Sequence, residues 1–242
     1  MRNTSAETNL DIHSWMEDFV QELQRQFGYR LIFAGLQGSR GRGEGRADSD
    51  IDVVVVVDEL TSADLAAYGA LLDRLPHREL VCGFVSGKGE LAAWDRSELF
   101  QFARDTHPWF GSLDDILPPI RREDIVQAVH AGACGLYHAA VHNLLHDRSC
   151  PLLQELYKQA NFVLQAKHFL ETGEDRTRPQ DLLPHLDPED RAILEGRERA
   201  ALLPSPEAPE FRRLSEELIA WASRLIRGYG AQCSTPPAGA EI

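Results

Sequence analysis

Cysteines, long apolar runs and basic residues are scarce in this sequence, and each shortage argues against a class of protein. The 242 residues include four cysteines, at positions 82, 134, 150 and 233, and these form no CxxC pair. This scatter is typical of reduced thiols and argues against a disulfide framework or a structural zinc site. No apolar run approaches the roughly 20 residues of a membrane span, and the first residues lack the apolar core of a signal peptide. We therefore expect a cytoplasmic protein with no membrane partner.

Lysine and arginine are outnumbered by acids. Thirty-eight Asp and Glu against 25 Lys and Arg give a formal net charge of -13 at pH 7. An acidic surface disfavours binding to duplex nucleic acid and suits a cationic small molecule or a basic protein patch. The same surface also keeps a protein soluble, so the charge on its own identifies no partner.

The first half of the chain combines helical and strand patterns. Apolar residues recur at intervals of three and four between Ile12 and Phe27, which predicts a helix with one buried face. Further apolar runs predict three strands, at 31–36, 51–57 and 79–87, and a helix at 62–75. Ser62 is the expected N-cap of that helix, and the valines of 53–57 favour a strand buried on both faces. We interpret residues 1–117 as an α/β (α+β) domain with a small mixed sheet.

From about Arg121 the strand patterns stop, and long helical patterns punctuated by prolines take over. They predict helices at about 121–147, 151–172, 188–202 and 210–227, with a short one at 180–186. Pro118 and Pro119 mark the expected boundary between the two halves. We interpret residues 118–230 as an all-α helical bundle domain and residues 231–242 as a flexible tail.

The stretch GSRGRGEGRADSDIDVVVVV, residues 38–57, places two carboxylates at the start of the valine-rich strand. Asp50 and Asp52 are two residues apart, so strand alternation directs both to the same side of the sheet. Carboxylates held this close repel each other unless a cation lies between them. Mg²⁺ fits, because it binds one or two carboxylates and fills its other positions with water and phosphate oxygens. The pair therefore predicts a magnesium site with a phosphate nearby.

The glycine-rich segment before the acids contains groups that suit a phosphate. Gly38, Gly41 and Gly43 allow backbone N–H groups to face an anion, and Ser39 adds a hydroxyl donor. Since this turn follows one predicted strand and the acids begin the next, both should converge on one end of the sheet. A triphosphate between them suits nucleotidyl transfer assisted by two metal ions. A hairpin loop with solvated acids is the structural alternative, and the order of turn, acids and buried strand argues against it.

This stretch resembles the signature of the polymerase-beta-like nucleotidyltransferase superfamily, written as Gly-Ser, a spacer, Gly, then Asp-x-Asp on the next strand. The matching residues are Gly38, Ser39, Gly43, Asp50 and Asp52. The form DSDID is similar to that of minimal and aminoglycoside nucleotidyltransferases. The resemblance implies an enzyme that uses ATP or another nucleoside triphosphate with two Mg²⁺ ions. Gly41 departs from the alanine often found in such motifs, which we expect to loosen the turn without removing a ligand.

Members of this superfamily usually carry a third carboxylate on a later strand, as metal ligand or base. The resemblance makes Glu79 the candidate, since it opens the predicted strand 79–87, and Glu90 is the alternative. If neither reaches the site, Asp50 and Asp52 alone must hold the metals.

Basic residues near the turn are candidate phosphate ligands. Arg40, Arg42 and Arg46 flank the turn, and Lys88 follows the third predicted strand. Each of them also fits a solvated position on a loop.

The predicted bundle carries three histidines spaced four apart, His138, His142 and His146. At about 1.5 Å rise per residue the outer two are some 12 Å apart, so one metal ion could bind only an adjacent pair. The alternatives are packing within the bundle and the lining of a ligand site.

Together these patterns predict a Mg²⁺-dependent nucleotidyltransferase that moves a nucleoside monophosphate, AMP from ATP, to a hydroxyl group and releases pyrophosphate. The expected acceptor is a small molecule such as an aminoglycoside, which would make antibiotic resistance its role. Two alternatives stay open: a protein hydroxyl, as in antitoxin-type adenylyltransferases, and a catalytically weak nucleotide-binding regulator. A homodimer is compatible with the sequence.

Overall fold

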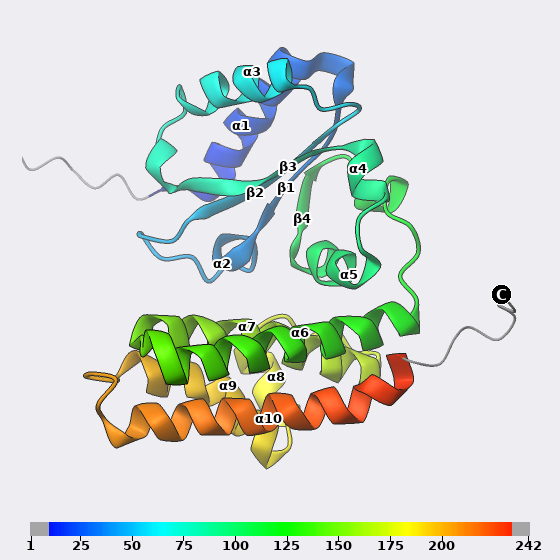
Figure 1. The fold of residues 1–242 in the computed structure, drawn as a ribbon. Coiled ribbons are helices and arrows are strands. Elements are labelled where there is room, and N and C mark those ends of the chain that lie inside the picture. Colours follow the sequence, from blue (N-terminus) through cyan, green and yellow to red (C-terminus); the bar gives the residue numbers. More distant parts are fainter. Residues whose placement is uncertain (1–9, 234–242) are drawn as a thin grey trace, which may run out of the picture. The chain divides into compact units, whose positions relative to one another are not determined.

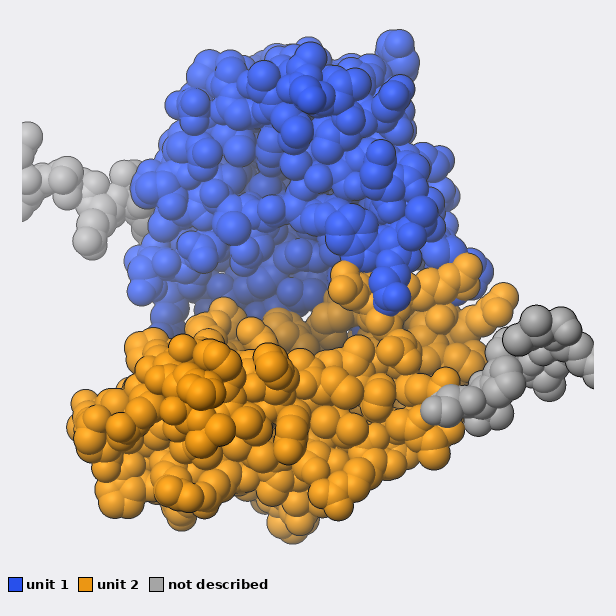
Figure 2. All heavy atoms as spheres, viewed as in Figure 1, with its two compact units in different colours: residues 1–95, 102–119 blue, residues 96–101, 120–242 orange. Residues whose placement is uncertain are grey.

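The computed structural model describes residues 10–233, which divide into two compact units (Figure 2). Unit 1 contains the described residues up to Asp95 together with Phe102–Pro119, and unit 2 contains Arg96–Gln101 and the described residues from Ile120 onward. Helix α5 (Arg96–Asp105) therefore contributes residues to both units. Within the described range, none of the helices is both long and apolar enough to cross a membrane.

Unit 1 is built on a four-stranded sheet in the order β3-β2-β1-β4 (Figure 1). The strands are β1 (Leu31–Gln37), β2 (Ile51–Val57), β3 (Val81–Gly87) and β4 (His107–Phe110). β1 runs antiparallel to both β2 and β4, whereas β2 and β3 run parallel to each other. The prediction of a small mixed sheet is therefore confirmed. The sequence pattern showed no sign of β4, a short strand whose second residue is a proline.

β2 is buried on both faces, as its run of valines predicts. Alternate residues of the strand join an apolar cluster with α1 (Ile12–Phe27) and α3 (Ser62–Leu72), namely Val53, Val55 and Val57. Val54 and Val56 alternate with them and are fully buried on the opposite face. Asp52 has the same parity as Val54, so it projects from that second face at the start of the strand.

Short elements connect the strands and helices of unit 1. They are α2 (Gly38–Gly41), α4 (Lys88–Ala92) and the 3-10 turns η1 (Gly28–Arg30), η2 (Arg78–Leu80) and η3 (Leu113–Asp115). The N-cap of α3 is Thr61: its hydroxyl accepts the N–H of Asp64, and the Asp64 carboxylate accepts the Thr61 N–H at 2.9 Å. The prediction of Ser62 was wrong by one residue, because Ser62 is already the first residue of the helix.

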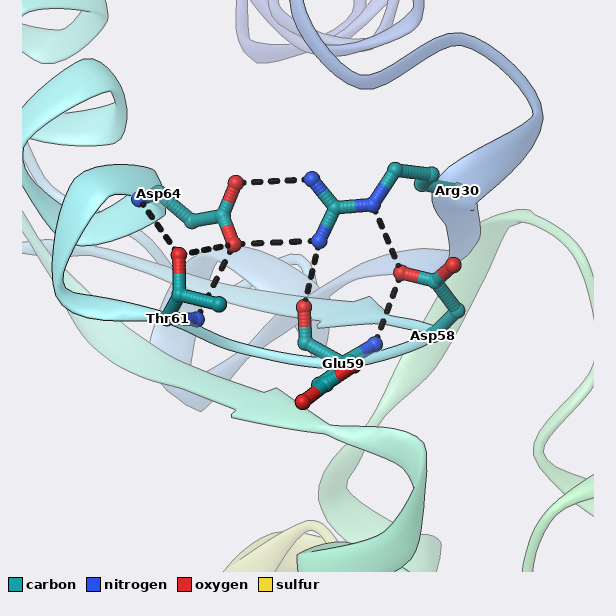
Figure 3. A network of polar contacts seen from close by, with 5 residues as sticks. All are labelled: Arg30, Asp58, Glu59, Thr61 and Asp64. Carbon is teal, nitrogen blue, oxygen red and sulfur yellow. Dashed lines mark hydrogen bonds and ion pairs between the residues drawn. The ribbon is translucent and has the colours of Figure 1, made fainter.

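Arg30 closes the end of the sheet at which β1 begins and β2 ends (Figure 3). Its guanidinium donates to Asp58 at 2.9 Å, to the two carboxylate oxygens of Asp64 at 2.8 and 3.0 Å and to the Glu59 carbonyl at 2.6 Å. The hydrogen bonds from Arg30, and after them those from Thr61, hold the pKa of Asp64 far below its usual range. Asp58 and Asp64 are thus both paired with one cation of the same chain.

Unit 2 is a helical bundle, as predicted (Figure 1). Its long helices are α6 (Arg122–His142), α7 (Cys150–Thr172), α9 (Pro188–Ala201) and α10 (Pro209–Cys233); between them lie α8 (Pro179–Leu182), the π turn η4 (Asn143–Asp147) and the 3-10 turn η5 (Leu183–His185). One apolar cluster joins the long helices. α10 includes residues 231–233 of the predicted tail, and the rest of that tail, 234–242, lies outside the described residues.

A buried carboxylate links three helices of unit 2. Asp190 of α9 accepts from the Lys167 ammonium of α7 at 2.6 Å and from the Trp221 indole N–H of α10 at 2.8 Å. Burial would lower the pKa of Lys167, but its ion pairs, chiefly that with Asp190, outweigh this effect and raise the pKa. Lys167 therefore has a structural role within the bundle.

Candidate active site

The glycine turn and the two acids meet at one end of the sheet. The antiparallel register pairs Gln37, the last residue of β1, with Asp52 near the start of β2. Gly38 follows directly, with φ of 69°, and a Cβ added to it would lie 2.2 Å from the Asp52 carboxylate oxygen Oδ2. Glycine is therefore required at this position both by its backbone conformation and by space. The predicted convergence of turn and acids on one sheet end is confirmed.

The turn itself is a compact element. α2 (Gly38–Gly41) is followed by backbone bonds from the Glu44 N–H to the Ser39 carbonyl at 2.7 Å and from the Gly43 N–H to the Arg40 carbonyl at 3.2 Å. A Cβ at Gly41 would lie 2.9 Å from the Leu36 carbonyl oxygen and 3.0 Å from the His107 ring. Gly41 thus permits close packing of the turn against β1 and β4, a more specific role than the expected loosening.

The three arginines beside the turn have different surroundings. The Arg40 guanidinium donates to the Ser49 carbonyl at 2.8 and 3.0 Å, so it holds the loop that leads into Asp50. Arg42 pairs with Asp105 and, at 3.3 Å, with Glu44. Arg46 is exposed, and its guanidinium has no hydrogen bond or ion pair with any residue in the described range. Of the three, Arg46 is the one whose charge is open to an incoming phosphate.

Asp105, at the end of α5, is a residue of this site that sequence reasoning missed. The Gly38 N–H donates to its carboxylate at 3.1 Å, and the Arg42 guanidinium donates to the other carboxylate oxygen. Its side chain is only 14% exposed, so these bonds are shielded from water. No local motif marks Asp105, because it reaches the turn only through the pairing of β4 with β1.

Glu79, the predicted third carboxylate, lies outside β3. It belongs to η2, its side chain is 74% exposed, and its carboxylate lies 4.0 Å from the His77 ring. The register pairs Ile51 with Val81, so Glu79 lies at the same sheet end as the acids but beyond the paired residues. The β3 residue that directly faces Asp52 is Cys82, an exposed free thiol. The role of Glu79 as a ligand stays a prediction.

The structure does not bring Lys88 and Glu90 to this end of the sheet. Both lie in α4, which begins where β3 ends, and the parallel register places that end beside Val57. Strands of this length extend about 20 Å at roughly 3.3 Å per residue. Lys88 and Glu90 are therefore separated from Asp52 by the length of the strand.

The residues of the site fit a Mg²⁺ ion that is coordinated by two protein carboxylates. No group of three or more His, Cys, Asp or Glu that could hold a metal occurs among residues 10–233. Asp50 is exposed, and Asp52 lies against the turn at Gly38. Mg²⁺ accepts one or two carboxylates when phosphate oxygens and water complete its coordination. Asp50 and Asp52 would hold the ion, and a phosphate on the adjacent turn would supply the remaining charge.

His138, His142 and His146 form a row of tilted rings on α6 and η4. The ring centroids of His138 and His142 are 6.4 Å apart, and those of His142 and His146 are 4.8 Å apart. The His142 Nδ1 lies 3.0 Å from the Asp147 carboxylate. All three side chains are exposed, which argues against packing within the bundle, and the lining of a ligand site stays a prediction.

Known proteins resemble this chain in sequence profile and in fold. Residues 16–100 match the sequence profile of the family described as "Nucleotidyltransferase domain". Among solved structures, the chain is similar to a spectinomycin adenyltransferase, AAD(9), from Enterococcus faecialis, solved with ATP and spectinomycin. The two share 14% sequence identity and a TM-score of 0.58, over 88% of this chain and 98% of that chain, a likeness of fold. No curated protein matches the chain in sequence.

Proposed function

We propose that the chain moves AMP from ATP to a hydroxyl group of a small molecule, on the premise that residues 16–100 match the family described as "Nucleotidyltransferase domain". The chain is thus an enzyme of the nucleotidyltransferase class. One observation carries the proposal: the β1–β2 register places Gly38 of the turn directly against Asp52 of the acidic pair. A triphosphate bound at the turn would have its charged oxygens beside both carboxylates.

Each residue of the site has a definable part in this reaction. Asp50 and Asp52 hold the metal ions, and the Ser39 hydroxyl donates to a phosphate oxygen. The Gly43 N–H donates to the Arg40 carbonyl, so Gly43 shapes the turn that presents Ser39. Gly38 gives room for this contact, since its own N–H already donates to Asp105. When bound, Mg²⁺ would promote loss of the acceptor proton and neutralise the pyrophosphate that leaves. The turn and acids act by positioning and by charge, which suits in-line transfer.

An aminoglycoside-like acceptor is the substrate class that we favour. The net charge of -13 suits a polycationic molecule. The similar fold belongs to a protein solved with ATP and spectinomycin. On this proposal the biological role is antibiotic resistance.

One observation favours a second candidate, a nucleotide-binding regulator with weak turnover. Glu79 is mostly exposed and lies outside β3, and the residue that faces Asp52 is the thiol Cys82. A site whose metal ligands are Asp50 and Asp52 alone would bind a nucleotide but transfer it slowly.

Transfer from labelled ATP separates these functions. The protein is incubated with Mg²⁺ and ATP labelled at the α-phosphate, together with a panel of aminoglycosides or a cell lysate. A labelled small molecule supports the proposal, a labelled protein supports the antitoxin-type alternative, and binding without transfer supports the regulator. Asp52→Asn should lower transfer by about 100-fold or more, because one metal ligand loses its charge.

The matched control is Asp73→Asn. This carboxylate is 74% exposed, lies in the same unit and pairs with Arg78 at 3.2 Å. It should transfer at the wild-type rate. Wild-type transfer by Asp52→Asn would overturn the metal assignment.

A further inference from the structure

The segment at the end of α5 and the start of β4 anchors the glycine turn from outside the matched family segment. The Gln37 amide donates to the Thr106 hydroxyl at 2.6 Å, just before the turn begins. Asp105 accepts the Gly38 N–H at 3.1 Å and the Arg42 guanidinium. His107 lies against Gly41. Three successive residues, 105 to 107, thus contact the chain just before the turn, at its start and at its end.

Asp105 is the charged member of this anchor. Its side chain is 14% exposed and that of Arg42 is 15% exposed, so the pair is mostly shielded from solvent. A charged pair in such a place is rigid only while both partners are present, because either one alone leaves a poorly hydrated charge. The carboxylate also fixes the direction of the Gly38 N–H, and with it the Gln37–Gly38 peptide that leads into Ser39.

We propose that Asp105 is a positioning residue for the triphosphate. It acts through Gly38 and Arg42, setting the shape of the turn before the nucleotide arrives. The inference rests on the proposed function, in which the turn receives phosphates. Arg42 also neutralises Asp105, which would otherwise repel the incoming anion.

This arrangement predicts how three variants rank in their Kd for ATP. Asp105→Asn should raise the Kd for ATP about tenfold, since the turn loses its ionic anchor. Arg42→Ala should weaken binding further, because the carboxylate is then unpaired beside the phosphates. The double variant Arg42→Ala with Asp105→Asn should bind better than Arg42→Ala alone. A residue that served only to fold the unit would show this order in the Tm and leave the Kd for ATP of the folded variants near the wild-type value.

Four measurements on the full chain test the proposal. The Kd for ATP with Mg²⁺ is determined by calorimetry, the Tm by thermal unfolding, and KM and kcat by the transfer assay. Hydrogen exchange of the amides of 38–43 reports the order of the turn without any nucleotide. For Asp105→Asn we expect a higher KM with kcat near the wild-type value at saturating ATP, and faster exchange at 38–43. Asp73→Asn, which pairs elsewhere in unit 1, should change none of these.

The outcomes separate this inference from the proposed function. Wild-type exchange at 38–43 in Asp105→Asn would overturn the positioning role, as would tighter ATP binding, which would make Asp105 a competitor of the phosphate. Failure of the wild-type protein to bind ATP would overturn the proposed function, while the exchange data would still decide whether Asp105 orders the turn.

Discussion

The two ends of the β1–β2 pair differ in how their charged side chains are arranged. At the end where β1 begins, Arg30 is surrounded by Asp58, Asp64 and the Glu59 carbonyl, so these two carboxylates have a cationic partner (Figure 3). At the other end, Asp50 is exposed and Asp52 lies against Gly38. At the first end, the ion pairs of Arg30 with Asp58 and Asp64 stabilise the fold. The second end holds carboxylates where a cation and a phosphate are expected. Paired opposite charges thus indicate a structural role, and neighbouring carboxylates indicate the candidate site.

The largest effect should follow from filling the space at Gly38. Gly38→Ala places a Cβ 2.2 Å from an Asp52 carboxylate oxygen and forces a side chain into φ of 69°. We expect a loss of about 100-fold or more in kcat/KM, because the acid and the turn must separate. Gly69→Ala is the control, since a Cβ there meets nothing within 4 Å. Activity within twofold of wild type for Gly38→Ala would show that the two elements do not act together.

A smaller loss should follow from releasing the loop before Asp50. Arg40→Met removes the bonds to the Ser49 carbonyl but keeps much of the apolar stem. We expect about a tenfold loss in kcat/KM, since a metal ligand loses the support that orients it. Arg46→Met, which breaks no bond within the described chain, should instead weaken ATP affinity with little effect on the loop. Equal effects of the two variants on ATP affinity would contradict the assignment of Arg40 as a brace.

A variant in the ion pairs of Arg30 should lower the stability of the fold without changing the rate of nucleotidyl transfer. Because the pKa of Asp64 is lowered in the folded state, its contribution is complete above the unfolded pKa of about 4 and is lost as the pH falls toward the folded value. Asp64→Asn should therefore lower the Tm at neutral pH, with the difference from wild type shrinking below about pH 4. Thermal unfolding between pH 2 and pH 7 measures this, with Asp73→Asn as the exposed control. A Tm difference that stays constant down to pH 2 would show that the charge of Asp64 does not stabilise the fold.

The smallest effect should come from Lys88. The register places it at the far end of β3 from Asp52, so Lys88→Ala should leave the Kd for ATP within about twofold of wild type. Calorimetry at low ionic strength gives the most sensitive comparison. A loss of tenfold or more would restore the sequence-based assignment of Lys88 as a phosphate ligand and would require a different path for the nucleotide.

The sequence predicted the parts of unit 1 that depend on neighbouring residues. Periodicity located β1 and β2, and the turn between them could be interpreted because glycine, serine and the acids are close in the chain. It could not find Asp105, whose role depends on the pairing of β4 with β1. It also placed the start of β3 two residues early, because the apolar pattern does not distinguish the 3-10 turn at Glu79 from a strand. Residues whose roles arise from long-range pairing carry no local signal.

The anchoring of the turn by residues 105 to 107 also has a consequence for biosynthesis. When residues 16–100 have emerged from the ribosome, the whole matched family segment is outside it. Asp105 and β4 emerge later. Until they emerge, one edge of β1 stays unpaired and the Gly38 turn lacks its anchor. An unpaired edge strand is prone to associate with other chains. The nascent protein should therefore acquire nucleotide affinity late, and a polypeptide cut after residue 100 should aggregate more readily than one cut after residue 119.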